Sequence, residues 1–242
     1  FGVGYPGWHI ECTGISLKYL GEHLDIHGGG VDNIFPHHTN EIAQSEAINN
    51  NNLANYWMHN GHINVDGVKM SKSLGNFVLA KDFIKKHDPN VIKIAMFKTH
   101  YRLPFNITDD LFNEAKLIDD KLKTVLKQAV VKMQLYHISF NQLKRDEHAE
   151  EIMNEDFNTP NLITYLSELI KELNSEIRSN TNFSQTYDKI TIINQILGLY
   201  YDLPTLTDED IKLYNDWLTA RNNKDFNVAD ELRNKLVNKN IL

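Results

Sequence analysis

Apolar side chains recur at alternating steps of three and four residues after position 108. The first series contains Leu111, Ala115, Ile118, Leu122, Val125, Ala129 and Met133. This spacing puts the apolar side chains on one face of a helix, which then packs against other helices. Thr108 suits the N-cap position, and Asp109 and Asp110 fall in the first turn, where the helix dipole favours negative charge. The pattern predicts one long helix that begins after Thr108.

Further helical patterns follow. A second helix is expected to begin at Thr159, as the cap, with Pro160 at the first helical position. Its apolar series contains Leu162, Leu166, Leu169, Ile170 and Leu173. A third helix is expected over residues 187–197, ended by Gly198. Residues 106–200 are therefore predicted to form a helical bundle. A linker and a charged helical pair, residues 208–223 and 226–238, then make up a small C-terminal element at 201–242, which we expect to be incomplete.

The first hundred residues have a different character. Short β-like runs at residues 24–26 and 62–65 alternate with glycines and helical segments, which is typical of an α/β fold. Residues 49–52 form a polar run that predicts an exposed turn. We therefore expect an α/β part at residues 1–105, followed by the helical bundle.

Composition narrows the class of protein. Hydrophobic residues make up 41% and charged residues 24%, as in ordinary soluble proteins, and no apolar run is long enough for a membrane span. The single cysteine excludes an internal disulfide and fits a cytoplasmic location. A net charge of −7 disfavours general coating of nucleic acid but leaves room for a local basic surface. Because residue 1 is Phe rather than Met, we expect the chain to begin inside a longer protein.

Candidate metal ligands lie in the α/β part, which holds nine of the 11 histidines. Cys12, His37 and Glu41 are donor types that zinc accepts, with room for a fourth ligand. If Pro36 opens a helix, His37 and Glu41 share one face, and His38 points about a quarter-turn away. Separately, a lone cysteine is more often a small buried hydrophobe, and a histidine–glutamate pair is more often a surface pair. Together they predict a zinc site.

Two loops suit a nucleotide. Gly28, Gly29 and Gly30 follow a strand-like run and precede Asp32, so the backbone could approach a ligand while Asp32 accepts hydrogen bonds from a ribose or an amine. A plain turn explains these residues equally well. The run KMSKS at residues 69–73 lacks the glycines of a Walker loop, yet Lys69 and Lys72 could clamp a triphosphate. A solvated basic loop is the alternative.

In this order the segments resemble the cysteinyl-tRNA synthetases, a family of class I aminoacyl-tRNA synthetases. The resemblance covers nearly the whole chain and is carried by GWHIEC at 7–12, HGGG at 27–30, FPHHTNE at 35–41, YWMH at 56–59 and KMSKSLGN at 69–76, with weaker matches at 156–160 and 220–230. It implies an incomplete Rossmann-like catalytic part followed by a tRNA-binding helical bundle and an anticodon-binding element.

The resemblance also implies residue roles. Zinc would be held by Cys12, His37, Glu41 and one cysteine from an earlier segment, and would bind the thiolate of substrate L-cysteine. Trp8 would wall the substrate pocket, with His27 beside it. The glycines, Gly28 and Gly30 among them, and Asp32 would line the adenosine side. Lys72 would contact the phosphates of ATP, which binds with Mg²⁺, and Lys69 would support the loop.

The implied function is cysteine activation by ATP followed by transfer to tRNA(Cys), without a membrane partner. The family's His-Ile-Gly-His type signature and first zinc cysteine are absent here, so we expect this stretch alone to be unable to activate cysteine. Two alternatives stay open: a cysteine:amino-sugar ligase, which has a similar site but no use for an anticodon, and a catalytically silent tRNA-binding fragment. On composition alone, a solvated face explains the charges of the last two helices better than RNA contact does.

Overall fold

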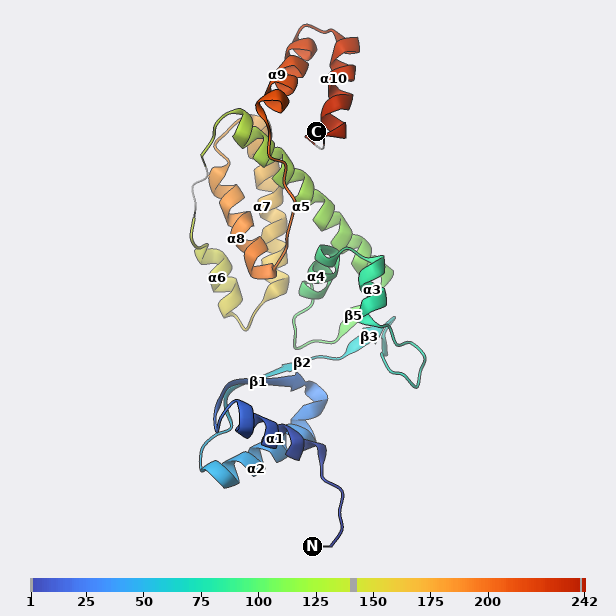
Figure 1. Ribbon diagram of the computed structural model, residues 1–242, viewed down its shortest axis with the longest axis vertical. Coiled ribbons are helices and arrows are strands. Elements are labelled where there is room, and N and C mark those ends of the chain that lie inside the picture. The colour runs from blue at the N-terminus through green and yellow to red at the C-terminus, as the bar shows by residue number, and fades with distance from the viewer. Residues whose placement is uncertain (1, 140–142, 240) are drawn as a thin grey trace. The chain divides into compact units, whose positions relative to one another are not determined.

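A computed structural model describes residues 2–139, 143–239 and 241–242 (Figure 1). By its internal contacts the chain divides into two compact units. The first comprises Phe1–Leu79 and Thr99–Thr108, and the second comprises Ala80–Lys98 and Asp109–Leu242. The helices α3 (Ala80–Lys86) and α4 (Pro89–Phe97) thus belong to the second unit although they precede residue 105. The boundaries expected at 105 and 200 stay predictions.

Two parallel strands form the centre of the first unit. β1 (Leu24–Gly30) pairs with β2 (Ala54–Asn60), with His27 opposite Trp57. Parallel strands need a crossover connection, and α2 (Thr39–Asn49) provides it. α1 (Trp8–Tyr19) precedes β1 and lies beside α2 (Figure 1). The strand expected at residues 24–26 is confirmed and extends through all three glycines.

A small core and one polar contact hold α1 and α2 in place. Leu24, Leu53 and Ala54 are buried together, and Ile42 of α2 packs against them. The hydroxyl of Thr13 on α1 donates to Oε1 of Gln44 on α2 at 2.9 Å. These contacts hold α1 against α2, and α2 against the two strands.

A second small sheet leads into the KMSKS run. Its central strand, β3 (Ile63–Val65), pairs antiparallel with β4 (Val68–Lys69) and parallel with β5 (Phe105–Ile107). The turn between β3 and β4 is Asp66-Gly67, and both residues have positive φ, 48° and 80°, as a tight two-residue hairpin requires. The expected strand over 62–65 is confirmed within one residue.

The second unit is helical. Its long helix α5 (Asp109–Leu135) confirms the first apolar series, because Ala115, Leu122, Val125 and Ala129 are fully buried. α7 (Thr159–Ser179) packs against α5, and α8 (Ser184–Leu197) packs against α7 (Figure 1). Gly198 ends α8 in the left-handed conformation. A short helix, α6 (Glu147–Asn154), was not predicted. Asn158 rather than Thr159 caps α7, because its Oδ1 accepts from the Asn161 amide at 3.2 Å.

A helical hairpin ends the described chain. It consists of α9 (Asp208–Asn222) and α10 (Phe226–Asn238), which confirms the helical pair expected at 208–223 and 226–238 within one residue. Trp217, Ala220 and Leu236 form its buried core with Val131 of α5. Within the described residues, none of the helices combines the length and apolar character that crossing a membrane demands.

Candidate functional site

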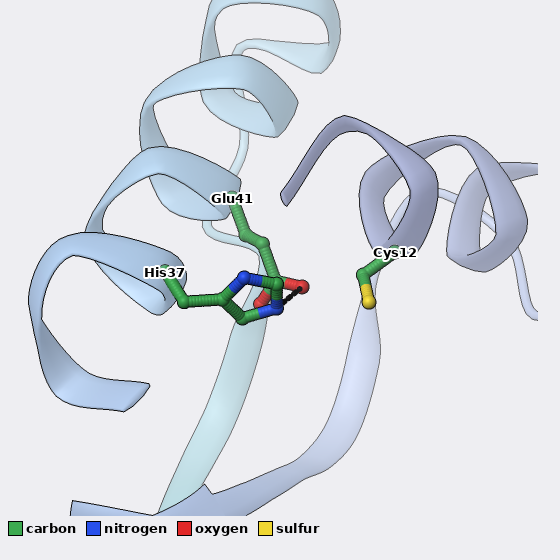
Figure 2. A group of neighbouring side chains, drawn as sticks. All are labelled: Cys12, His37 and Glu41. Carbon is green, nitrogen blue, oxygen red and sulfur yellow. Dashed lines mark ion pairs between the residues drawn. The ribbon is translucent and has the colours of Figure 1, made fainter. Parts of the chain in front are cut away.

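Cys12, His37 and Glu41 converge although they come from three different elements (Figure 2). Cys12 lies on α1, Glu41 lies in the first turn of α2, and His37 lies in the short π-helical turn Ile34–His38 that precedes α2. One ligand atom from each of the three side chains lies within 4.8 Å of the other two. The donors of a tetrahedral zinc ion are separated by about 3.5 Å, so small side-chain rotations would bring this set to zinc geometry.

The carboxylate of Glu41 is the most buried part of this group, with 1% of the residue exposed. Its Oε2 accepts a hydrogen bond from Nε2 of His27 at 2.6 Å. Its Oε1 lies 3.1 Å from Nε2 of His37 but accepts no hydrogen bond within the described structure. A buried carboxylate oxygen without a hydrogen bond is costly, and a cation would remove that cost. The buried Oε1 of Glu41, which lacks a hydrogen bond, is therefore the observation that favours a metal ion among these residues.

The surroundings of Glu41 also change the pKa of the Cys12 thiol. Burial raises the pKa of the Cys12 thiol, and the negative charges of Glu41 and Glu11 raise it further. These surroundings therefore favour the thiol over the thiolate. A divalent cation among them would oppose both effects, since a metal deprotonates a coordinating thiol. The thiolate needed for metal binding thus depends on the metal's own charge.

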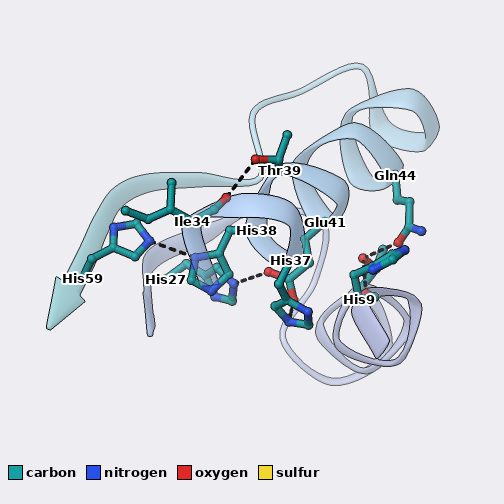
Figure 3. A network of polar contacts seen from close by, with 10 residues as sticks. His9, His27, Ile34, His37, His38, Thr39, Glu41, Gln44 and His59 are labelled. Atoms are coloured by element: carbon teal, nitrogen blue, oxygen red, sulfur yellow. Dashed lines mark hydrogen bonds and ion pairs between the residues drawn. The ribbon is translucent and has the colours of Figure 1, made fainter. Parts of the chain in front are cut away.

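His38 lies closer to Glu41 than the sequence suggested. Nδ1 of His38 is hydrogen-bonded to Nε2 of His59 at 2.8 Å, and the rings of His38 and His27 are 4.9 Å apart (Figure 3). A second group with ligand atoms within 4.8 Å consists of His27, His38 and Glu41. The expectation that His38 turns away from Glu41 is therefore wrong. It overlooked that residues three apart on a helix also face each other: the backbone is right-handed helical at His38 and Thr39, so His38 and Glu41 lie on neighbouring positions of one face.

Burial explains why these imidazoles favour the neutral form. Burial lowers the pKa of His38, against the charge of Glu41, which raises it. Burial also lowers the pKa of His59, and the positive charge of Arg102 acts in the same direction. Neutral imidazoles keep a lone pair and can act as metal ligands or hydrogen-bond acceptors.

Two tryptophans flank the group. The ring of Trp8, 59% exposed, lies 3.9 Å from the ring of His37, measured between centroids. The ring of Trp57 on β2 meets His27 edge to face at 4.7 Å. Trp8 therefore lies against a candidate metal ligand, and His27 contacts both Glu41 and Trp57. Their roles toward a substrate stay predictions.

The glycines on β1 make room for neighbouring side chains. A Cβ on Gly29 would lie 2.8 Å from Cε1 of His38, so a side chain at this position would displace the imidazole. A Cβ on Gly30 would lie 2.5 Å from Oδ1 of Asp32. Gly28 faces the carbonyl oxygen of Met58, which would lie 3.3 Å from an added Cβ. The nucleotide-binding roles expected for Gly28, Gly30 and Asp32 stay predictions.

Asn76 shapes the KMSKS loop. Its Oδ1 accepts from the Ser71 amide at 2.9 Å, and its Nδ2 donates to the Lys69 carbonyl at 3.3 Å. Gly75 takes a φ of 70°, which favours glycine. The ammonium of Lys72 lies 5.7 Å from the centre of the Phe77 ring, and that of Lys69 lies 3.4 Å from Nε2 of His62. The loop thus carries both lysines on a hydrogen-bonded backbone.

The structure brings Trp8, Cys12, His27, His37 and Glu41 into one group. Sequence reasoning missed three members of the surrounding cluster: His38, His59 and Trp57. The abundance of histidine in the first hundred residues was the available signal. The number of histidines could not show which residues lie together, because the register of β2 against β1 determines where His59 and Trp57 lie.

Known proteins match both parts of the chain. Residues 1–117 match the family described as tRNA synthetases class I (C) catalytic domain, and residues 148–201 match the DALR domain. A cysteine–tRNA ligase from Oceanobacillus iheyensis is 42% identical over 263 aligned residues, covering 100% of this chain and 55% of that protein. One from Staphylococcus aureus strain JH9 is 42% identical over 257 residues with the same coverage.

A solved structure agrees at the level of fold. The ternary complex of agnB2 LeuRS, tRNA and LeuAMS from Agrobacterium radiobacter K84 aligns with a TM-score of 0.55 at 15% identity, over 73% of this chain and 25% of that chain. The chain spans about half the length of the ligases it matches. Its incomplete α/β part and helical part carry the two family matches in that order. The chain therefore belongs to the family of class I tRNA synthetases that contains the cysteine–tRNA ligases.

Proposed function

We propose that the complete protein containing this chain activates L-cysteine with ATP to cysteinyl-adenylate and pyrophosphate, and passes the cysteinyl group to the 3′ end of tRNA(Cys). The main support is the convergence of Cys12, His37 and Glu41 around the buried Oε1 of Glu41, which lacks a hydrogen bond. These donors suit a metal that also accepts sulfur.

Cys12, His37 and Glu41 would hold zinc, with a fourth ligand from outside this chain. When bound, zinc would supply a Lewis acid that prefers the thiolate of cysteine to the hydroxyl of serine. His27 keeps Oε2 of Glu41 engaged and thereby leaves Oε1 for the metal. Trp8 lies against His37, where it would cover one side of the amino-acid pocket.

ATP would bind at the lysine loop and the β1 glycines. Lys72 would contact the phosphates, and Lys69 would support the loop with its backbone tied to Asn76. Negative charge grows on the leaving pyrophosphate, so positioned ammonium groups, together with Mg²⁺ brought by ATP, lower the barrier mainly by electrostatics and positioning. Gly28, Gly30 and Asp32 would line the adenosine side.

The helical unit offers a basic surface for tRNA. One hollow of about 730 Å³ and another of about 600 Å³ lie along α5 and α7 and share Arg178. Their basic side chains are Lys121, Lys123, Lys127, Lys132, Lys171 and Arg178. No aspartate or glutamate lines either hollow in the described chain, although the net charge is −7. Such a surface suits a phosphate backbone.

This surface and the DALR match favour tRNA over the small acceptor of a cysteine:amino-sugar ligase. The donors around Glu41 favour an enzyme over a catalytically silent tRNA-binding fragment.

Cysteine-dependent ATP–pyrophosphate exchange in the full-length protein tests the proposal. We expect exchange with cysteine but not with serine, and at least about a hundredfold loss in the Lys72→Ala variant. Lys85→Ala, an exposed lysine on α3, is the matched control and should retain activity. Wild-type exchange in the Lys72→Ala variant would remove the assignment of Lys72 to ATP. Binding of tRNA without any ATP–pyrophosphate exchange would favour the catalytically silent fragment.

A further inference from the structure

The two carboxylate oxygens of Glu41 face two different groups of side chains. Oε1 lies 3.1 Å from Nε2 of His37, in the group that includes Cys12 (Figure 2). Oε2 lies 2.6 Å from Nε2 of His27, in the group that includes His38 (Figure 3). A carboxylate placed this way can serve each group with a separate oxygen.

The second group is built like a metal site. His27, His38 and Glu41 each offer a ligand atom within 4.8 Å of the others, and two imidazoles with one carboxylate are a zinc donor set. His38 is 4% exposed, and its Nδ1 is hydrogen-bonded to Nε2 of His59 at 2.8 Å. Ligating histidines commonly make such a bond through the nitrogen that does not bind the metal, which fixes the ring and its tautomer.

The backbone also accommodates this group. The Cε1–Nε2 edge of His38 faces Gly29, where a Cβ would lie only 2.8 Å from Cε1. Gly29 lies on β1 two residues after His27, so both residues share one face of the strand. The absence of a side chain at Gly29 therefore lets the His38 ring settle beside the His27 ring, 4.9 Å away between centroids.

We propose that His27, His38 and Glu41 form a second, weaker zinc site, and that Glu41 bridges two ions when both sites are filled. The second ion would displace the proton shared by His27 and Oε2, and their separation would open from 2.6 Å to about 3.3 Å. It binds more weakly because it has three protein ligands and lies beside another cation. Carboxylate-bridged ions of this kind sit about 3.5–4 Å apart.

Filling the second site inhibits the enzyme. The second ion draws electron density from Glu41, takes His27 away from its hydrogen bond and adds positive charge beside the amino-acid pocket. This inhibition, unlike the site itself, rests on the proposed function. Zinc above the amount needed for the first site would thus act as a reversible inhibitor.

Metal titration of the full-length protein tests the site directly. The metal-free protein is titrated with Zn²⁺ against a chromophoric chelator, in parallel with the His38→Asn variant and with His148→Asn, an exposed histidine on α6, as the matched control. We expect the wild type and His148→Asn to bind one tight and one weaker ion. His38→Asn should keep the tight ion and weaken the other at least about tenfold.

Cobalt provides a readout that needs no variant. The first Co²⁺ ion should give a sulfur-to-metal charge-transfer band from Cys12, and the second, bound by nitrogen and oxygen, should add no further intensity to that band. A single ion at saturating metal, or equal weak binding in wild type and His38→Asn, would overturn the site. Zinc inhibition of cysteine-dependent exchange that is unchanged in His38→Asn would overturn the inhibition alone. Absence of exchange in the wild type at one zinc per chain would instead count against the proposed function.

Discussion

Nε2 of His27 donates to Oε2 of Glu41 at 2.6 Å, so a ring on β1 fixes the orientation of a carboxylate on α2. The same bond leaves Oε1 free of hydrogen bonds next to His37. A strand and the α-helix that follows it thereby determine which oxygen can receive a metal. His27 acts here as a positioning residue.

Removing this bond should weaken zinc binding at the first site. We expect His27→Ala to lower its zinc affinity by about 10–100-fold, because Glu41 loses its orientation. His27→Gln, which retains an N–H donor, should recover part of the loss. Competition with a chelator measures the affinity, and His23→Ala, whose ring contacts the Asn52 carbonyl, is the control. Equal affinities in the wild type and His27→Ala would contradict the positioning role.

Substitution of a metal-binding side chain should empty the zinc site formed by Cys12, His37 and Glu41. Cys12→Ser and Glu41→Gln should each purify with little zinc, because a hydroxyl and an amide are poor substitutes for a thiolate and a carboxylate. Elemental analysis against protein concentration checks this. Glu46→Gln, an exposed carboxylate on the same helix as Glu41, should retain full zinc. Full zinc occupancy in Cys12→Ser would remove the assignment of that ligand.

The basic surface on α5 and α7 should determine the salt dependence of tRNA binding. In the triple variant Lys121→Gln, Lys171→Gln and Arg178→Gln, the slope of log affinity against log salt should flatten by about 0.7–0.9 for each phosphate that no longer pairs with a basic side chain. The KM for tRNA should rise, whereas exchange measured without tRNA should stay unchanged. A triple variant with the wild-type slope would show that tRNA binds elsewhere.

The hairpin of α9 and α10 should lose stability in acid through Asp210. Its Oδ1 accepts from Nζ of Lys239 at 2.6 Å, and its Oδ2 accepts from the Thr207 amide at 3.0 Å. The bond from Lys239, and then those from Thr207, lower the pKa of Asp210 from 3.8 to about 2. A lowered pKa stabilises the fold above the unfolded-state pKa, and this stability is lost as pH falls toward the folded-state value.

We therefore expect Asp210→Asn to cost about 1 kcal/mol of unfolding free energy at pH 7, after allowance for the partly exposed lysine. The difference from wild type should shrink between pH 5 and pH 3. Urea unfolding at several pH values measures it, with the exposed Asp208→Asn as the control. A difference that is constant over this range would exclude the ionised carboxylate as its cause.

Two glycines of the first unit should respond oppositely to alanine. A Cβ on Gly61 would lie 2.2 Å from the carbonyl oxygen of Leu103, and backbone cannot move away cheaply, so Gly61→Ala should cost more than about 2 kcal/mol. Gly14 lies within α1 with open space around it, so Gly14→Ala should stabilise by about 0.5–1 kcal/mol. Thermal unfolding of both variants compares them. A Gly61→Ala variant that unfolds at the wild-type temperature would contradict the close approach of Gly61 to the Leu103 carbonyl.

Local patterns predicted most of the helical unit and part of the site. The apolar series of α5 and α7 and the left-handed Gly198 follow from spacing and residue type, which act within a few residues. The cap of α7 was misplaced by one residue, since Asn158 and Thr159 both suit that position. The short helix α6 was missed because so few residues carry little periodic signal.

The sequence by itself determined the donor types and the four-residue spacing of His37 and Glu41, because both are local properties of the chain. Only the tertiary structure decided that Cys12 reaches them from α1, that His27 engages one oxygen of Glu41, and that His38 joins His59 rather than turning away. These relationships depend on strand register, on the kink at Phe35 before α2 and on the packing of α1 against α2. Burial of the Glu41 carboxylate is likewise a property of the packed chain, and no spacing of residues along the sequence encodes it.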